Sequence, residues 1–276
     1  FGGITFLPLS KTTPKSLSEE YLTQFGKALD LADKLGMKVI FYDDVDFPSG
    51  SAGGQLAERF PDSFLKCLKK AEWEVEGPAT FTDRSPIAFA EKSLYGSESG
   101  VFQGAVAMNM ATFERVNISS SVAQDGAISW EVPAGKWKIM LFVCVAAKND
   151  HVDVLSRDAV RNFFTLTYDK FYERFKDHFG TTIRASFFDD LASEHDSGWA
   201  LEFAEKYRSL WGEDKDPVLD YPALYYPIGK DTPSARYRLW TTRNRLFADG
   251  YIAMAREWRK SRGIDMLSTG HPQGPY

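Results

Sequence analysis

The start of the chain alternates between strand-like and helix-like patterns, and this alternation constrains the fold most strongly. Residues 3–9 are apolar, residues 16–35 carry apolar side chains every three or four positions, and residues 38–42 are apolar again. Ser18 can cap the helix and Gly36 can end it. A strand, a helix and a strand joined by short turns form a βαβ unit, in which the strands are parallel. The sequence therefore predicts a parallel sheet.

The second predicted strand ends abruptly in a cluster of acids. Tyr42 is followed by Asp43, Asp44 and Asp46, and then by a turn rich in Pro, Ser and Gly over residues 47–54. Carboxylates are rarely buried in an apolar strand, so we expect them just past its C-terminal end. That is where α/β proteins hold their functional groups. The alternative is that these acids only form the turn and cap a helix.

Residues 72–150 change in character from helices to short alternating strands. A parallel sheet does not need such hairpin-like spacing, so we predict an antiparallel β insertion. The predicted organisation is a first part of an α/β barrel over residues 1–71, the insertion over residues 72–150, and the rest of the barrel over residues 151–276. The strands expected in the insertion are residues 73–76, 87–90, 105–110, 128–132 and 137–145, with a turn at 133–136.

The α/β pattern resumes after the insertion and repeats the opening feature. An apolar run over residues 182–188 leads directly into Asp189 and Asp190, and a last strand over residues 264–268 ends near His271. Other expected elements are a strand at 151–155, helices at 156–175, 199–211 and 236–262, and a long loop at 216–233.

Two acid clusters at strand ends indicate a specific chemistry. In a parallel barrel all C-terminal strand ends share one face, so Asp44 and Asp190 can meet in one cleft. Glycoside hydrolysis needs two carboxyl groups across a cleft: one protonates the leaving oxygen, and the other attacks the sugar or activates water. Trp199 is a candidate sugar platform, although its apolar helical surroundings favour a core position.

Composition excludes several other functions. The net charge is −5 and no basic stripe is present, so nucleic acid is not an expected partner. No apolar run approaches the ~20 residues of a membrane span. Cys67 and Cys144 are far apart in apolar surroundings and are predicted to be buried thiols. The Gly-rich turn lacks the Lys-Ser/Thr of a phosphate-binding loop. The acids do not follow calcium-loop spacing, so calcium has only weak support.

The acid-rich turn also carries a family resemblance. Tyr42-Asp43-Asp44 followed by residues 48–54, PSGSAGG, resembles the "YDE…PSGxAGG" signature of large bacterial glycoside hydrolases similar to the family 106 α-L-rhamnosidases. Residues 133–137 and 152–155 fit the same group, and Phe187-Phe188-Asp189-Asp190 is similar to its "FTDE" strand end.

The resemblance implies a fold and a location. It implies an α/β architecture of the (β/α)8, TIM-barrel-like kind with an inserted antiparallel β subdomain. Only about five barrel-type strands are predicted here, so we expect the barrel to be incomplete in this chain and further strands to lie outside it. The resemblance further implies periplasmic, cell-surface or secreted localisation in polysaccharide-degrading bacteria, additional β domains in the same protein, and a carbohydrate substrate. Some members hold a divalent cation, such as calcium, near the sugar.

The resemblance also suggests roles for the acids. Asp190 is the expected general acid, and Asp44 or Glu194 the base that activates water, with inversion favoured. Candidate substrate-binding residues are Asp43, Asp46, Asp189, His271 and Trp199. Where the signature has Glu, this chain has Asp44 and Asp190, which retracts each carboxylate by ~1.5 Å. A misplacement near 1 Å can cost ~100-fold in rate. A non-catalytic carbohydrate-binding module, and a fragment that is inactive alone, therefore remain alternatives.

Overall fold

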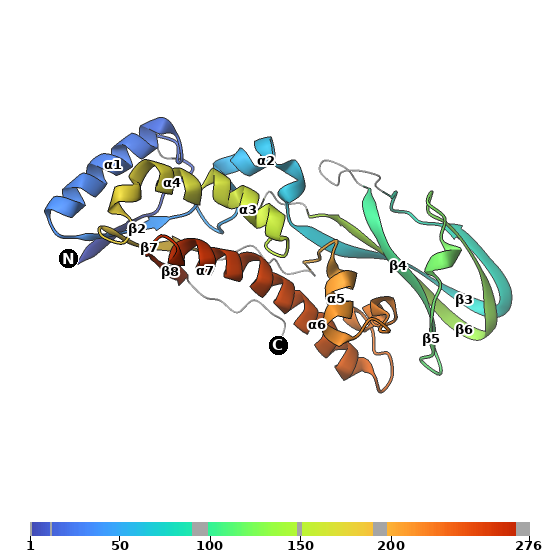
Figure 1. The fold of residues 1–276 in the computed structure, drawn as a ribbon. Coiled ribbons are helices and arrows are strands. Elements are labelled where there is room, and N and C mark those ends of the chain that lie inside the picture. Colours follow the sequence, from blue (N-terminus) through green and yellow to red (C-terminus); the bar gives the residue numbers. More distant parts are fainter. Residues whose placement is uncertain (1, 12, 90–98, 148–150, 190–197, 269–276) are drawn as a thin grey trace. The chain divides into compact units, whose positions relative to one another are not determined.

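The computed structural model describes residues 2–11, 13–89, 99–147, 151–189 and 198–268 (Figure 1). The chain divides into two compact units. Unit 1 comprises Phe1–Leu65, Lys148–His195 and Phe247–Tyr276, and unit 2 comprises Lys66–Ala147 and Asp196–Leu246. Residues 196–246 therefore lie in the same unit as the antiparallel strands, although the sequence pattern placed them with the α/β part.

Unit 1 is built on a four-stranded parallel sheet. Its strands are β1 (Gly3–Phe6), β2 (Lys38–Tyr42), β7 (Ile183–Phe188) and β8 (Asp265–Ser268), in the order β1-β2-β7-β8. The register places Phe6 beside Phe41 and Tyr42 beside Phe187. Because the strands are parallel, their carboxyl ends lie along one edge of the sheet. The predicted parallel sheet is confirmed.

Helices of unit 1 cover the sheet through a cluster of aromatic side chains. The ring of Phe41 on β2 stacks on Phe171, with ring centroids 4.7 Å apart, and Phe25 packs edge-on against Phe171 at 5.2 Å. The helices are α1 (Glu19–Lys34), α2 (Gln55–Arg59), α3 (Arg157–Leu166), α4 (Tyr168–Phe175) and α7 (Ala253–Lys260), with a π-helical turn at Ala248–Ile252 before α7. The predicted cap is confirmed, since the Ser18 hydroxyl accepts the Tyr21 N–H at 3.1 Å.

Among the described residues, unit 2 contains an antiparallel sheet and two α-helices. The strands are β3 (Lys66–Arg84), β4 (Gly100–Asn109), β5 (Arg115–Asn117) and β6 (Ala127–Ala146), in the order β3-β6-β4-β5. The helices are α5 (Phe203–Trp211) and α6 (Thr232–Phe247). Ile139, Leu141 and Val143 of β6 are fully buried in its apolar core. Cys67 and Cys144 form no disulfide with each other, as predicted; Cys144 is buried as expected, whereas Cys67 is only partly buried.

The predicted turn at residues 133–136 is wrong, because these residues lie inside the long strand β6. The register between β3 and β6 shifts here: Gly77 pairs with Gly135, and Ala79 pairs with Val132. A Cβ on Gly77 would lie 2.1 Å from the Pro133 carbonyl oxygen, so only glycine fits. The Pro and Gly residues therefore mark an irregularity in a continuous strand pair.

Two further predictions in unit 1 are wrong for local reasons. Residues 151–155 do not form a strand, because Asp153 makes a turn: its carboxylate accepts the Leu155 N–H at 3.1 Å, and its carbonyl accepts the Ser156 N–H at 3.1 Å. The predicted helix over residues 156–175 breaks at Thr167. The hydroxyl of Thr167 donates to the Phe163 carbonyl at 3.0 Å, and its backbone is distorted to φ −118° and ψ −79°.

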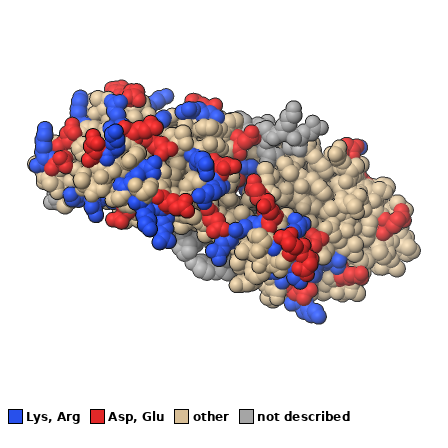
Figure 2. Space-filling model, viewed as in Figure 1, with Lys and Arg blue, Asp and Glu red and all other residues tan. Residues whose placement is uncertain are grey.

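The predicted barrel is seen only in part. Over the described residues the fold is mixed α/β, with one parallel and one antiparallel sheet, and it does not include a complete barrel. No helix of the described residues is long and apolar enough to cross a membrane. On the face drawn in Figure 2, Lys and Arg side chains are interspersed with Asp and Glu, so neither sign of charge forms a continuous stripe there.

The two faces of α1 give a matched test of this packing. Leu29 is 1% exposed and Leu31 is 57% exposed on the same helix. We expect Leu29→Ala to lower the free energy of unfolding by about 2–5 kcal/mol, because it opens a cavity. Leu31→Ala should change it by less than about 0.5 kcal/mol. Urea unfolding followed by circular dichroism measures both, and equal losses would contradict the placement of α1.

Candidate active site at the carboxyl edge of the parallel sheet

Asp44, the second residue after β2, is buried and holds the following loop together. Its Oδ2 accepts the N–H groups of Gly50 and Ser51, both at 2.6 Å. Its Oδ1 accepts the N–H of Val45 at 2.8 Å, the N–H of Gly53 at 2.9 Å and the Ser51 hydroxyl at 3.2 Å. A carboxylate has about four lone-pair positions, so these five donors occupy it fully.

Burial and these donors act on the Asp44 carboxyl in opposite directions. Burial raises the pKa of Asp44, and the backbone N–H groups of Gly50, Val45 and Gly53 act against that rise because they stabilise the charged form. Gly53 has φ +63°, a conformation that favours glycine, and this allows the turn to close on the carboxylate.

Asp43 is fully buried, and its two carboxylate oxygens face the loop and the helices. Its Oδ1 accepts the Ser49 hydroxyl at 2.7 Å, and its Oδ2 accepts the Tyr168 hydroxyl at 2.6 Å and the Tyr251 hydroxyl at 3.4 Å. Arg259 donates to the Tyr168 hydroxyl, so Tyr168 bridges the two charges. Both carboxylate oxygens of Asp43 are therefore taken by protein donors.

Arg259 extends this network to β7. It is 1% exposed, lies on α7, and donates through its Nε to the hydroxyl of Ser186. Its guanidinium carbon also lies 4.8 Å from the Tyr168 ring centroid. The network of Asp43, Ser49, Tyr168, Ser186, Tyr251 and Arg259, which we call the buried polar cluster, thus joins residues from the β2 end, β7, α4, the π-helical turn and α7.

The environment of Asp43 changes its protonation. Burial raises the pKa of Asp43 to about 7, and the charge of Asp44 adds to the rise. Hydrogen bonds from Tyr168 and Ser49 and the charge of Arg259 act in the opposite direction. Asp43 therefore titrates close to neutral pH, which is unusual for an aspartate.

Asp189 continues the face of β7 that carries Phe187. The rings of Phe187 and Tyr42 pack 5.7 Å apart, and Asp189 is two residues further along that face. Asp189 is partly buried. Its N–H donates to the Ser49 hydroxyl at 3.0 Å, and its carbonyl accepts the Ser49 N–H at 2.8 Å. The ends of β2 and β7 are thus joined through Ser49.

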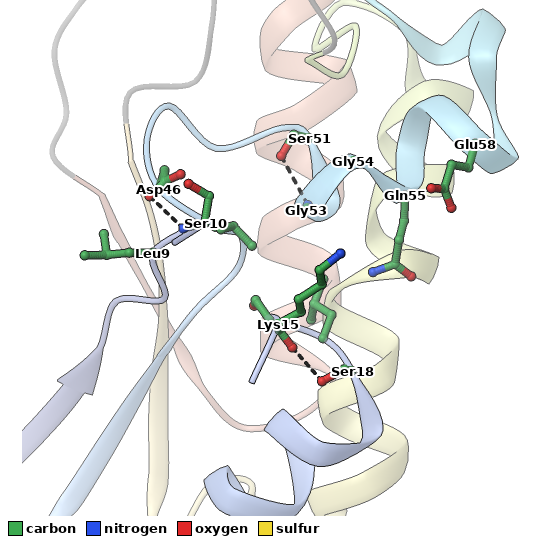
Figure 3. Close-up of a pocket in the computed structure, with 13 residues that line it drawn as sticks. Leu9, Ser10, Lys15, Ser18, Asp46, Ser51, Gly53, Gly54, Gln55 and Glu58 are labelled. Carbon is green, nitrogen blue, oxygen red and sulfur yellow. Dashed lines mark hydrogen bonds between the residues drawn. The ribbon is translucent and has the colours of Figure 1, made fainter. Parts of the chain in front are cut away.

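Asp46 borders a cleft of about 570 Å³ at the carboxyl ends of β1 and β2 (Figure 3). The volume is within the ~300–1,000 Å³ of small-molecule sites. The Ser10 N–H donates to Asp46 Oδ1 at 3.1 Å, and the side chain and backbone of Ser10 lower the pKa of Asp46. Lys15, Gln55 and Glu58 also line the cleft, which therefore offers donors and acceptors of both charges.

The structure brings Asp43, Asp44, Asp46 and Asp189 to one edge of the sheet, as the spacing predicted. Asp190, Glu194 and His271 lie outside the described residues.

Trp199 belongs to unit 2 and is 2% exposed. Its ring stacks on Phe203 at 3.8 Å, and its indole N–H donates to Gln103 at 3.1 Å. This is the core position that its helical surroundings favoured.

Sequence reasoning missed Ser49, Tyr168, Ser186, Tyr251 and Arg259 as members of the site. For Arg259 the pattern shows only that it lies four residues after Ala255 and so on the same face of α7, which does not by itself indicate a buried arginine. Among the described residues no group of three or more His, Cys, Asp or Glu side chains could hold a metal ion. A calcium site stays a prediction.

Asp44→Asn tests the loop. The amide keeps the shape but replaces one acceptor by a donor, so loop N–H groups lose their partner at a cost of about 1–3 kcal/mol. Amide hydrogen exchange at Gly50, Ser51 and Gly53 should accelerate relative to the native protein. The exposed Asp177 gives the control variant Asp177→Asn, which should leave those amides unchanged. Unchanged exchange in Asp44→Asn would show that the carboxylate does not hold the loop.

The substitution Asp43→Asn tests whether the Asp43 carboxyl titrates near neutral pH in the folded protein. A carboxyl whose pKa is raised by folding contributes stability that is complete below the unfolded pKa and is lost as the pH rises through the folded value. The shift from 3.8 to about 7 corresponds to about 4 kcal/mol. We expect the free energy of unfolding of the native protein, relative to Asp43→Asn, to fall by about that amount between pH 4 and pH 8. A pH-independent difference between the two proteins would contradict the buried titration.

Comparison with known proteins agrees with this architecture. The family model for alpha-L-rhamnosidase, glycoside hydrolase family 106, matches residues 79–271, more than half of the chain. The matched region includes Asp189 and Asp190 but begins after the signature at residues 42–54. No match is found among curated proteins.

A solved rhamnosidase from Novosphingobium sp. PP1Y has a similar fold, with a TM-score of 0.66 over 97% of this chain, at 11% sequence identity. This chain spans 43% of that one. At this identity the likeness concerns the fold alone, whereas the family match rests on the sequence. The chain belongs to the family 106 of glycoside hydrolases, the α-L-rhamnosidases.

Proposed function

We propose that this chain is the part of a glycoside hydrolase that carries its catalytic acids, and that it cleaves rhamnosyl linkages in side chains of plant or bacterial polysaccharides. The observation that supports this most is that β2 and β7, neighbouring parallel strands, both end in acidic residues in a member of this family. Active sites of (β/α)8 enzymes are formed at that end of the strands.

The hydrogen bonds that occupy the Asp44 carboxylate favour Glu194 over Asp44 as the general base. A general base must have a free lone pair for the proton of the attacking water. Asp44 has five donors on its two oxygens, so it orders the loop instead. We therefore propose Asp190 as the general acid and Glu194 as the base, in an inverting reaction.

Sugar hydroxyls are proposed to bind along the carboxyl edge of the sheet. Hydrogen bonds from Ser10 lower the pKa of Asp46, so they stabilise its charged form, and its carboxylate borders the cleft and can accept hydrogen bonds from a sugar. Asp189 and His271 complete the proposed set. Calcium near the sugar is part of the same proposal.

The remainder of the protein is proposed to complete the barrel. β1 and β8 are the edge strands of the parallel sheet, and the similar rhamnosidase is more than twice as long as this chain. Strands from the rest of the protein would pair with these edges and close a (β/α)8 barrel. The segments of unit 1, which carry β1, β2, β7 and β8, would be barrel segments, and the antiparallel strands of unit 2 would be its insertion. Further β domains and export to the periplasm or cell surface belong to this proposal.

A non-catalytic carbohydrate-binding role is the second candidate. It is favoured by Asp44, which stands where the signature has Glu and is fully used by the loop. Calorimetry with rhamnose-containing oligosaccharides distinguishes the two. Binding without release of reducing ends, in the full-length protein, would support the second candidate and remove the first.

Two substrates that differ in their leaving group test the general-acid role of Asp190 in the full-length protein. A general acid matters most when the leaving group is poor, and its loss typically costs about 10²–10⁴-fold. We expect Asp190→Asn to lose that factor on an alkyl or glycosyl α-L-rhamnoside and much less on a nitrophenyl α-L-rhamnoside. Glu194→Gln should lose activity on both, because water must be activated in each case.

The matched control for these variants is Asp177→Asn, on the exposed surface of unit 1. It should keep native turnover of both substrates. Native turnover by Asp190→Asn on the poor leaving group would remove Asp190 from the mechanism.

A further inference from the structure

We propose that Ser49 is a positioning residue for the general acid. Its backbone and hydroxyl form hydrogen bonds with the main chain of Asp189, the residue before Asp190, and Asp43 orients that hydroxyl. This inference rests on the proposed function, in which Asp190 protonates the leaving group. It also gives Asp43 a different role from sugar binding.

Ser49 forms two hydrogen bonds with the main chain of Asp189. Ser49 donates its N–H to the Asp189 carbonyl at 2.8 Å and accepts the Asp189 N–H on its Oγ at 3.0 Å. Ser49 is fully buried, so these bonds do not compete with bulk water. Both main-chain polar groups of the residue before the proposed acid are thus paired with a single partner.

The hydroxyl of Ser49 has two acceptors within reach, Asp43 Oδ1 at 2.7 Å and the Tyr42 hydroxyl at 3.4 Å, and the shorter bond sets its orientation. A serine hydroxyl has one proton and two lone pairs. The proton is directed at Asp43 Oδ1, 2.7 Å away, which leaves a lone pair for the Asp189 N–H. Asp43 therefore orients the hydroxyl that accepts the Asp189 N–H at the end of β7.

Asp43 is in turn fixed from several elements. Tyr168 on α4 and Tyr251 on the π-helical turn donate to its Oδ2. Its own N–H donates to the Phe187 carbonyl at 3.2 Å, and Arg259 holds Ser186 on the same strand. The last residues of β7 are thus attached at positions 186, 187 and 189 to a single cluster centred on Asp43.

A sugar-binding role for Asp43 does not fit this geometry. Its side chain is 0% exposed, and both oxygens already accept hydrogen bonds from the protein. Asp43 is therefore placed to act through Ser49 and not on the substrate.

The test compares turnover on the two leaving groups in the full-length protein. Ser49→Ala removes the hydroxyl but keeps the N–H, so the acid is displaced rather than lost. An error near 1 Å costs about 100-fold. We expect kcat on the poor leaving group to fall by about 10–100-fold, kcat on the nitrophenyl substrate to fall by less than about threefold, and KM to stay near the native value.

The ratio of the two kcat values does not depend on how much of the protein is folded. A purely structural role of Ser49 would lower both values equally and leave the ratio native, which would overturn the inference. Ser261→Ala, at an exposed serine of unit 1, is the matched control and should keep the native ratio.

Two further results keep the inference separate from the proposed function. If Ser49→Ala yields no folded protein, Tyr168→Phe removes one donor to Asp43 and should shift the ratio in the same direction, and a native ratio there overturns the inference. If Asp190→Asn itself shows no dependence on the leaving group, the proposed function fails. If Asp190→Asn shows it and Ser49→Ala does not, only the positioning role fails.

Discussion

Unit 1 depends on the burial of two adjacent carboxylates at the end of β2. Asp43 and Asp44 are 0% and 1% exposed, and a buried carboxylate is tolerated only where donors surround it. The donors to Asp44 come from the loop at residues 45–53, so that loop is folded around it. The donors to Asp43 come from the loop, α4 and the π-helical turn. Removing either acid would leave several donors unpaired at once.

This arrangement changes what the acid-rich turn means for catalysis. Three acids after a strand invite the assumption that all of them face the substrate. Here one acid organises the loop, one anchors a buried polar cluster, and Asp46 borders the cleft. A Glu in place of Asp44 would carry its carboxylate about 1.5 Å further, past the point where the loop N–H groups converge. The departure from the family signature at this position therefore matches the geometry of this loop.

The sequence predicted the features that depend on local pattern. The spacing in α1, its Ser18 cap, the strands β2, β7 and β8, and the acids at two neighbouring strand ends were all accessible from it. Alternation along β2 also put Asp43 on the same face as Val39 and Phe41, and thus against the helices.

Other features depend on distant partners and could not be read from the pattern. The irregularity in the pairing of β3 and β6 depends on Gly77, which pairs with Gly135 before the register shifts. Arg259 is buried because Tyr168 and Ser186, about 90 and 70 residues earlier in the chain, accept its hydrogen bonds. The role of Asp44 required knowing that the turn folds back onto it, which residue types alone do not specify.

In the proposed mechanism, Asp43 and Asp44 build the site, and Asp190 and Glu194 perform the chemistry. A crystal structure of the full-length protein with a rhamnose-derived inhibitor tests this most directly. We expect the anomeric carbon to lie between the carboxyl groups of Asp190 and Glu194, ~6.5–9.5 Å apart, with no sugar atom hydrogen-bonded to Asp43 or Asp44. A sugar hydroxyl or attacking water bound to the Asp44 carboxylate would contradict it.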